Sequence, residues 1–171
     1  KGPQLVNYTL GPKLAAAVTN AGGLGVIGGL NQTPEQLESS LVELKSHLND
    51  EKNGVFGVDL ALPKVGGGAR ATNYDYTKGK LPELIEVIIK SGARLFVSAV
   101  GVPPAWAVQK LHKHGILVMN MIGSPKHVAR CLSVGVDIMC AQGGEGGGHT
   151  GEISTMVLIP AIVDTCRALK A

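Results

Sequence analysis

Three tandem copies of one short pattern constrain the fold of this chain more than any other feature of its sequence. Each copy runs from a helical pattern through a glycine into a short apolar run, and then into a turn rich in glycine or proline. The glycines, at positions 92, 115 and 135, stand where a helix must stop, because only glycine adopts a left-handed conformation there without a Cβ penalty. The apolar runs predict strands that begin 21 residues apart, at Leu95–Ala99, Ile116–Asn120 and Asp137–Ala141. One helix and one strand per repeat predict an α/β protein with a parallel sheet.

The alternation of helices and strands extends upstream, where it is less regular. Thr33 before Pro34 is typical of a helix N-cap, and Gln36 three residues after Thr33 completes a capping box. The strands are mostly continuous apolar runs, which predicts that both of their faces are covered. The predicted upstream elements are a weak strand at Gln4–Asn7, helices at Lys13–Asn20, Pro34–Leu48 and Leu81–Lys90, and strands at Leu24–Ile27 and Phe56–Leu60.

Two architectures are built from alternating strands and helices, the open doubly wound sheet and the closed eight-stranded barrel. The evenness of the short repeats favours the barrel, so we expect a (β/α)8 TIM-barrel type of fold. Only five to six βα units can be counted, whereas closure takes eight strands and typically about 250 residues. The expectation is a single domain over residues 1–171 that forms an incomplete TIM barrel.

Composition narrows the classes of partner. The net charge is only +3 and the chain has two Phe, so neither a nucleic-acid footprint nor a stacking platform is visible. Three cysteines without metal-ligand spacing are expected to be reduced core thiols, and no metal site is predicted. No apolar run approaches the ~20 residues of a membrane span, so we expect an intracellular, cytoplasmic protein with a small-molecule partner.

The stretch CAQGGEGGGHTGE, from Cys140 to Glu152, is the strongest candidate for a site. It follows a predicted barrel strand, and active sites of such barrels gather at the carboxyl ends of the strands. Glycines there let backbone N–H groups approach an anion or a flat ring, and His149 can exchange a proton near neutral pH. Composition alone is also compatible with a mobile linker, but the position after a buried strand favours a ligand-binding loop. The role of Glu145 stays open between an exposed carboxylate and one that caps the loop.

Other candidate residues carry weaker signals. Asp59 ends an apolar strand and is expected to face the barrel mouth, with a functional role slightly favoured. The long segment Pro63–Gly79 carries Tyr74 and Tyr76, which could fold over a ligand as a lid or simply be solvated. Gly22 and Gly23 are interpreted as a helix stop rather than a phosphate site. The remaining histidines, expected on the surface, are His47, His112, His114 and His127.

The motifs AQGGEGGGHTG, NAGGLGVIGG and FGVDL together resemble the nitronate monooxygenase family, whose usual loop reads Q-G-x-E-A-G-G-H-x-G. The resemblance implies an FMN-binding TIM barrel in which Gln142 and Gly147, with the neighbouring Gly148, contact the flavin. It also implies that His149 is the base that deprotonates a nitroalkane or positions its nitronate, with O2 as the co-substrate. Gly146 replaces the usual alanine, and Asp59 stands where the family usually has Asn.

Two other functions remain open. An FMN- and NAD(P)H-dependent enoyl reductase uses a related barrel and a similar glycine-histidine loop. A partial barrel that binds a phosphate ligand or a partner chain without turnover is the other alternative, because the family's late strands, whose loops hold the FMN phosphate, have no counterpart before Ala171. Oligomeric state is not indicated by the sequence, and a homo-oligomer is compatible with it.

Overall fold

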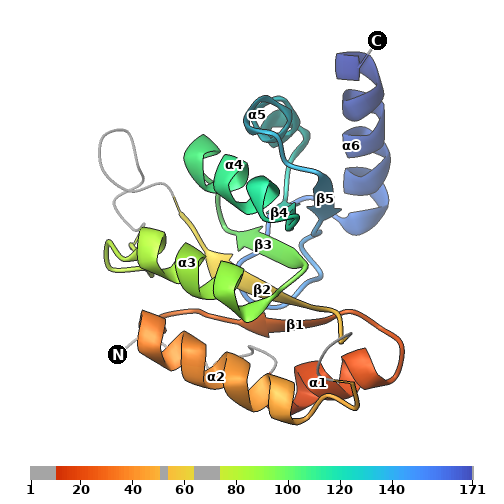
Figure 1. The fold of residues 1–171 in the computed structure, drawn as a ribbon. Coiled ribbons are helices and arrows are strands. Elements are labelled where there is room, and N and C mark those ends of the chain that lie inside the picture. Colours follow the sequence, from red (N-terminus) through yellow and green to blue (C-terminus); the bar gives the residue numbers. More distant parts are fainter. Residues whose placement is uncertain (1–10, 51–53, 64–73, 171) are drawn as a thin grey trace, which may run out of the picture.

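The computed structural model describes residues 11–50, 54–63 and 74–170, in which strands and helices alternate along the chain (Figure 1). The predicted elements within these residues are confirmed, and their bounds differ from the predicted ones by at most two residues. The weak strand predicted at Gln4–Asn7 lies outside the described residues, as does most of the segment Pro63–Gly79. The strands are β1 (Gly25–Gly28), β2 (Phe56–Ala61), β3 (Leu95–Ala99), β4 (Leu117–Ile122) and β5 (Ile138–Ala141). The helices are α1 (Pro12–Asn20), α2 (Pro34–Ser46), α3 (Leu81–Ser91), α4 (Ala105–Lys113), α5 (Val128–Val134) and α6 (Thr155–Lys170), with the short 3-10 helix η1 (Pro125–His127) before α5.

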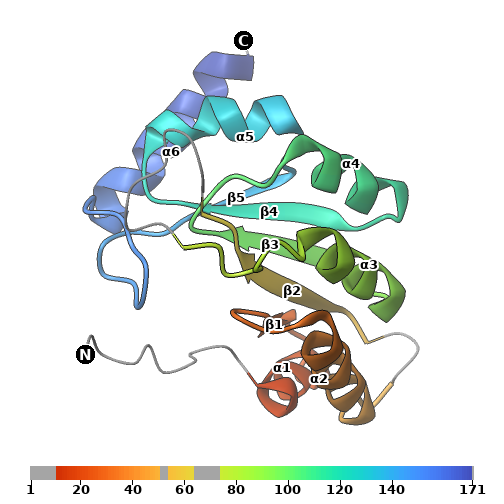
Figure 2. The same cartoon turned by 90° about the vertical axis from the view of Figure 1, so that its left-hand side faces the viewer.

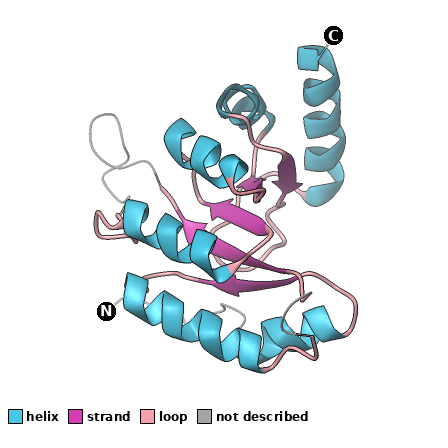
Figure 3. Ribbon diagram, viewed as in Figure 1, coloured by secondary structure: helices cyan, strands magenta, loops and turns pink. Residues whose placement is uncertain are grey.

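The five strands form one parallel sheet in the order β1-β2-β3-β4-β5 (Figure 3). Each strand therefore lies beside the strand that precedes it in the chain. A doubly wound sheet would instead contain a switch point where the strand order reverses. The observed order is that of a TIM barrel, so the structure is a partial barrel, as the repeat predicted.

The helices follow the strands around the outer face of the sheet (Figure 2). Side chains that point to this face, such as Val58, Leu60 and Phe96, are almost completely buried and form the core with the helices. The helix ends follow the local signals in the sequence. Gly92 ends α3 at φ 79° and Gly135 ends α5 at φ 89°, both in the left-handed region. The capping box of Thr33 at the start of α2 is also present.

The inner, concave face of the sheet is less covered than expected. In β3 almost every side chain is buried, but Leu117 of β4 is 50% exposed and Ile138 of β5 is 39% exposed. The prediction that both faces are covered is therefore wrong for β4 and β5. In β4, exposed or half-buried side chains alternate with buried ones, whereas every side chain of β5 is exposed or half-buried.

The carboxyl ends of all five strands lie at one edge of the sheet, because the strands are parallel. Loops that leave this edge, including the one from β5 to α6, are therefore neighbours even when they are distant in sequence. Among the described residues, no helix combines the length and the apolar character needed to cross a membrane.

Candidate active site

Residues 142–154 connect β5 to α6 and form a compact loop, here called the glycine loop (the blue loop at the left of Figure 2). The backbone N–H of Gln142 donates to the carbonyl of Ile122 at 3.0 Å, which extends the pairing of β4 and β5 into the loop. Gly144 N–H donates to the carbonyl of Ile153 at 3.0 Å and ties the two ends of the loop together. Backbone hydrogen bonds thus tie the glycine loop to the carboxyl end of β4 and close it at its base. The interpretation of this stretch as a mobile linker is not supported.

Glu145 fastens the glycine loop to the first turn of α6. Its carboxylate accepts hydrogen bonds from the backbone N–H of Thr155, at 3.1 and 3.0 Å, and from the Thr155 hydroxyl at 2.8 Å. Hydrogen bonds from the backbone N–H of Glu145 itself and from Thr155 hold the pKa of the carboxyl below its ordinary value. Of the two roles that the sequence left open, the structure supports the capping one.

The glycines of the loop serve two different purposes. A Cβ on Gly143 would lie 2.3 Å from the Thr155 hydroxyl oxygen, and one on Gly151 would lie 2.7 Å from the carbonyl oxygen of Gly123. These two positions must be glycine because the backbone packs closely there. At Gly147 and Gly148, by contrast, a Cβ would meet no atom within 4 Å. That part of the loop faces open space at the carboxyl edge of the sheet.

Gln142 lies at the base of the loop and is half-buried. Its side-chain Nε2 donates to the carbonyl of Gly147 at 3.3 Å, so the amide folds under the open segment. A Cβ on Gly146 would lie 2.9 Å from this Nε2. The replacement of the usual alanine by Gly146 therefore leaves room for the Gln142 amide in this position.

His149 is exposed at the tip of the glycine loop, where it meets a residue from a distant part of the chain. The hydroxyl oxygen of Tyr76 lies 3.4 Å from Nε2 of His149, and the two rings meet edge to face with centroids 6.2 Å apart. Tyr76 belongs to the segment between β2 and α3, 73 residues earlier in the sequence. Sequence reasoning missed this contact, although both segments follow the carboxyl ends of strands.

Asp59 lies on the concave face of β2, opposite the buried side chains of Val58 and Leu60. It is aligned with Gly28 of β1 and Val97 of β3. Its Oδ1 atom is buried and has no hydrogen-bond partner among the described residues. Burial raises the pKa of this carboxyl from its ordinary 3.8 to about 6. A carboxyl with such a pKa is protonated more readily than usual and can then donate as well as accept a hydrogen bond.

The structure thus places four of the predicted site residues in one loop and Asp59 on the inner face of the sheet. In the described part of the chain, no hydrogen bond joins Asp59 to the glycine loop. Of the other histidines, His47, His112 and His114 are exposed, as predicted, whereas His127 is half-buried. Nε2–H of His112 donates a hydrogen bond at 2.8 Å to the Asp137 carboxylate, which links α4 to the start of β5.

Metal and thiol chemistry have no support in the described residues. No group of His, Cys, Asp or Glu side chains in residues 11–50, 54–63 and 74–170 could hold a metal ion. Cys131, Cys140 and Cys166 are free thiols, and burial raises the pKa of Cys131 to about 11. Cys131 is buried, as expected of a core thiol, whereas Cys140 and Cys166 are half-buried.

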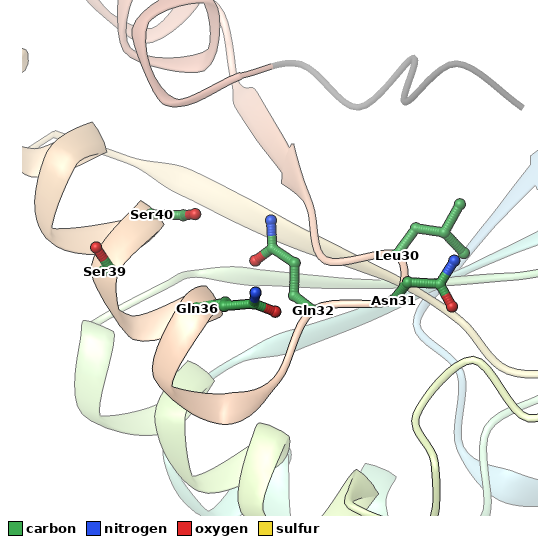
Figure 4. Close-up of a pocket in the computed structure, with 6 residues that line it drawn as sticks. All are labelled: Leu30, Asn31, Gln32, Gln36, Ser39 and Ser40. Carbon is green, nitrogen blue, oxygen red and sulfur yellow. The ribbon is translucent and has the colours of Figure 1, made fainter. Parts of the chain in front are cut away.

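A surface hollow of about 500 Å³ lies between the loop after β1 and the first turns of α2 (Figure 4). The Gln32 side chain lies beside α2, whereas Leu30 and Asn31 point away from the helix. Gln32 Oε1 is buried, and none of the residues that the structure describes forms a hydrogen bond with it. Neither Asp59 nor any residue of the glycine loop lines this hollow. It is therefore separate from the candidate active site.

Comparison of the sequence with known protein families identifies the family of this chain. Residues 7–167 match the family described as nitronate monooxygenase, which covers nearly the whole sequence. The chain belongs to the nitronate monooxygenase family. Nitronate monooxygenases are flavin-dependent oxidoreductases, so membership of this family indicates a flavin cofactor.

Individual relatives of this nitronate monooxygenase family member carry several names. The chain is 34% identical to a 5-hydroxy-7a-methyl-1-oxo-octahydro-1H-indene-4-carboxyl-CoA dehydrogenase of Rhodococcus jostii, covering 93% of this chain and 40% of the relative. It is 26% identical to a probable nitronate monooxygenase of Staphylococcus saprophyticus, covering 90% and 51%. The solved structure of FabK from Thermotoga maritima superposes with a TM-score of 0.76 at 27% identity, covering 94% of this chain and 45% of FabK. The chain thus spans about half of the length of the proteins that it resembles.

Proposed function

We propose that the protein is a flavin-dependent nitronate monooxygenase that uses FMN and O2 to convert nitronates or nitroalkanes into carbonyl compounds and nitrite. The observation that carries this proposal is the glycine loop, which presents His149 beside the open backbone of Gly147 and Gly148 at the carboxyl edge of a TIM-barrel sheet. In the overall reaction two nitronates and one O2 give two carbonyl compounds and two nitrite ions, so each nitronate carbon gains one oxygen atom and loses nitrite.

The residues present fit a flat polar ring such as that of a flavin. The bare backbone of Gly147 and Gly148 permits close approach, because a Cβ there would occupy space that no protein atom fills. Asp59 offers a buried carboxyl oxygen that has no partner in the described part of the chain, and a ligand donor or acceptor could satisfy it. We assign Gln142, Gly147, Gly148 and Asp59 to cofactor binding. A bound flavin would supply the electron transfer and the reaction with O2.

His149 supplies the proton chemistry in this proposal. With a neutral nitroalkane, an unprotonated imidazole nitrogen takes the proton from the carbon that bears the nitro group. The resulting nitronate spreads negative charge over its nitro oxygens, which the protonated imidazole and neighbouring backbone N–H groups can stabilise. The exposed position of His149 at the loop tip gives a substrate access to the ring.

The proposal is tested with the purified protein in two steps. We expect flavin absorption in the visible spectrum, with FMN as the released cofactor, and nitrite formation from an alkyl nitronate in air without a nicotinamide. A protein that stays colourless after incubation with FMN, and forms no nitrite, would favour the alternative of a ligand-binding barrel without turnover.

A flavin-dependent reductase of thioesters is the second candidate. It is supported by the similarity to FabK, and by the relative from Rhodococcus jostii that is described as a dehydrogenase of a carboxyl-CoA compound. Consumption of NAD(P)H with an enoyl thioester, together with no nitrite from nitronates, would identify this activity instead.

A further inference from the structure

The contact between Tyr76 and His149 joins two loops that the sequence separates by 73 residues. The distance of 3.4 Å between the phenol oxygen and Nε2 is slightly longer than the ~2.7–3.2 Å of most hydrogen bonds of this kind. The two rings also meet edge to face at an interplanar angle of 80°. In the described part of the chain, no other hydrogen bond to either ring nitrogen of His149 is formed.

A hydrogen-bonded turn around Asp75 holds Tyr76 in place. The Asp75 carboxylate accepts hydrogen bonds from the backbone N–H of Thr77 at 2.8 Å, the Thr77 hydroxyl at 2.7 Å and the backbone N–H of Gly79 at 2.8 Å. Thr77 is buried, and its carbonyl accepts from the N–H of Lys80, the residue before α3. This turn fixes the backbone on both sides of Asp75 and Thr77, so the direction of Tyr76 is set by the scaffold.

We propose that Tyr76 is a positioning residue for His149, whose phenol oxygen accepts the Nε2–H and leaves Nδ1 as the nitrogen that takes the substrate proton. This inference rests on the proposed function, because it assumes that His149 is the base. A neutral imidazole has one N–H and one lone pair, so a hydrogen bond that fixes the N–H on Nε2 also fixes the lone pair on Nδ1. After proton transfer both nitrogens carry hydrogen, and the phenol oxygen still accepts from Nε2.

The reverse orientation, in which the Tyr76 hydroxyl donates to Nε2, places the hydrogen of the neutral ring on Nδ1. Both nitrogens would then be engaged or protonated, and the ring would have no free lone pair for the substrate. Only the first orientation therefore serves a base at this position.

The experiment compares Tyr76→Phe with the matched control Tyr74→Phe, which removes a hydroxyl from the neighbouring ring 5.4 Å away. Each protein is assayed with a neutral nitroalkane, which must be deprotonated, and with its preformed nitronate, which need not be. We expect Tyr76→Phe to lower kcat for the nitroalkane about five- to tenfold, the factor for one ordinary hydrogen bond, and to change kcat for the nitronate by less than about twofold. Tyr74→Phe should match the wild type with both substrates.

A second measurement is independent of turnover. In the protein without substrate, NMR signals of the His149 ring should shift in Tyr76→Phe and stay in place in Tyr74→Phe. Unshifted ring signals in Tyr76→Phe, or equal slowing with nitroalkane and nitronate, would overturn the positioning role. A wild-type protein that oxidises neither substrate would instead overturn the proposed function, and with it the catalytic part of this inference, while the ring signals would still report whether the contact exists.

Discussion

Replacing Asp59 by Asn is expected to stabilise the ligand-free protein at neutral pH and to have less effect in acid. The folded state raises the pKa of this carboxyl from 3.8 to about 6, with burial as the cause. A raised pKa means that the folded state favours the protonated form, so the stability of the protein falls as pH rises from about 4 to about 6. Above pH 6 the penalty of the buried charge is fully present.

The size of this effect follows from the two pKa values. Their difference, at about 1.4 kcal/mol per pH unit, corresponds to about 3 kcal/mol as an upper limit. Because the Asp59 side chain is not completely buried, we expect Asp59→Asn to gain about 1–3 kcal/mol in the free energy of unfolding between pH 4 and pH 7, relative to the wild type.

Urea unfolding of both proteins between pH 4 and pH 8 measures this difference. Asp164→Asn is the matched control, because it removes the same charge from a side chain on α6 that is 77% exposed. The control should follow the wild type at every pH. A stability difference between Asp59→Asn and wild type that stays constant from pH 4 to pH 8 would refute the argument that folding desolvates this carboxyl.

Three further substitutions test the glycine loop. His149→Asn should lower the turnover of a neutral nitroalkane by about 10²–10⁴-fold and leave the visible flavin spectrum in place, and an unchanged rate would remove His149 from the role of base. Gly151→Ala should destabilise the fold by about 1–3 kcal/mol, because its Cβ would lie 2.7 Å from the carbonyl oxygen of Gly123. Gly147→Ala, which meets no atom within 4 Å, should keep the stability within about 0.5 kcal/mol but weaken FMN binding in a titration. Equal stability of the two alanine variants would contradict the packing argument.

The sequence predicted those parts of the fold that depend on local chemistry. Glycine can end a helix in the left-handed conformation, and a threonine followed three residues later by glutamine can cap one, so the ends at Gly92 and Gly135 and the capping box of Thr33 were predictable. The regular spacing of helices and strands likewise predicted the partial barrel. The exposure of Leu117 and Ile138 was not predictable from their apolar runs, because it depends on what covers the concave face.

The candidate site was predicted only within one segment. Gln142, Gly147, Gly148 and His149 share a loop, so their proximity follows from the sequence alone. The approach of Tyr76 depends on how two separate loops fold over the sheet edge, and no local pattern encodes such a contact. The capping role of Glu145 required the position of Thr155, ten residues away.

Oxidation of a preformed alkyl nitronate by the purified protein tests the central claim most directly. The assay is carried out in air, without any nicotinamide, and nitrite, the carbonyl product and O2 are measured together. Our account predicts that nitrite and the carbonyl compound form in equal amounts while O2 is consumed. Absence of nitrite from a protein with bound flavin, together with oxidation of NAD(P)H by an enoyl thioester, would contradict it.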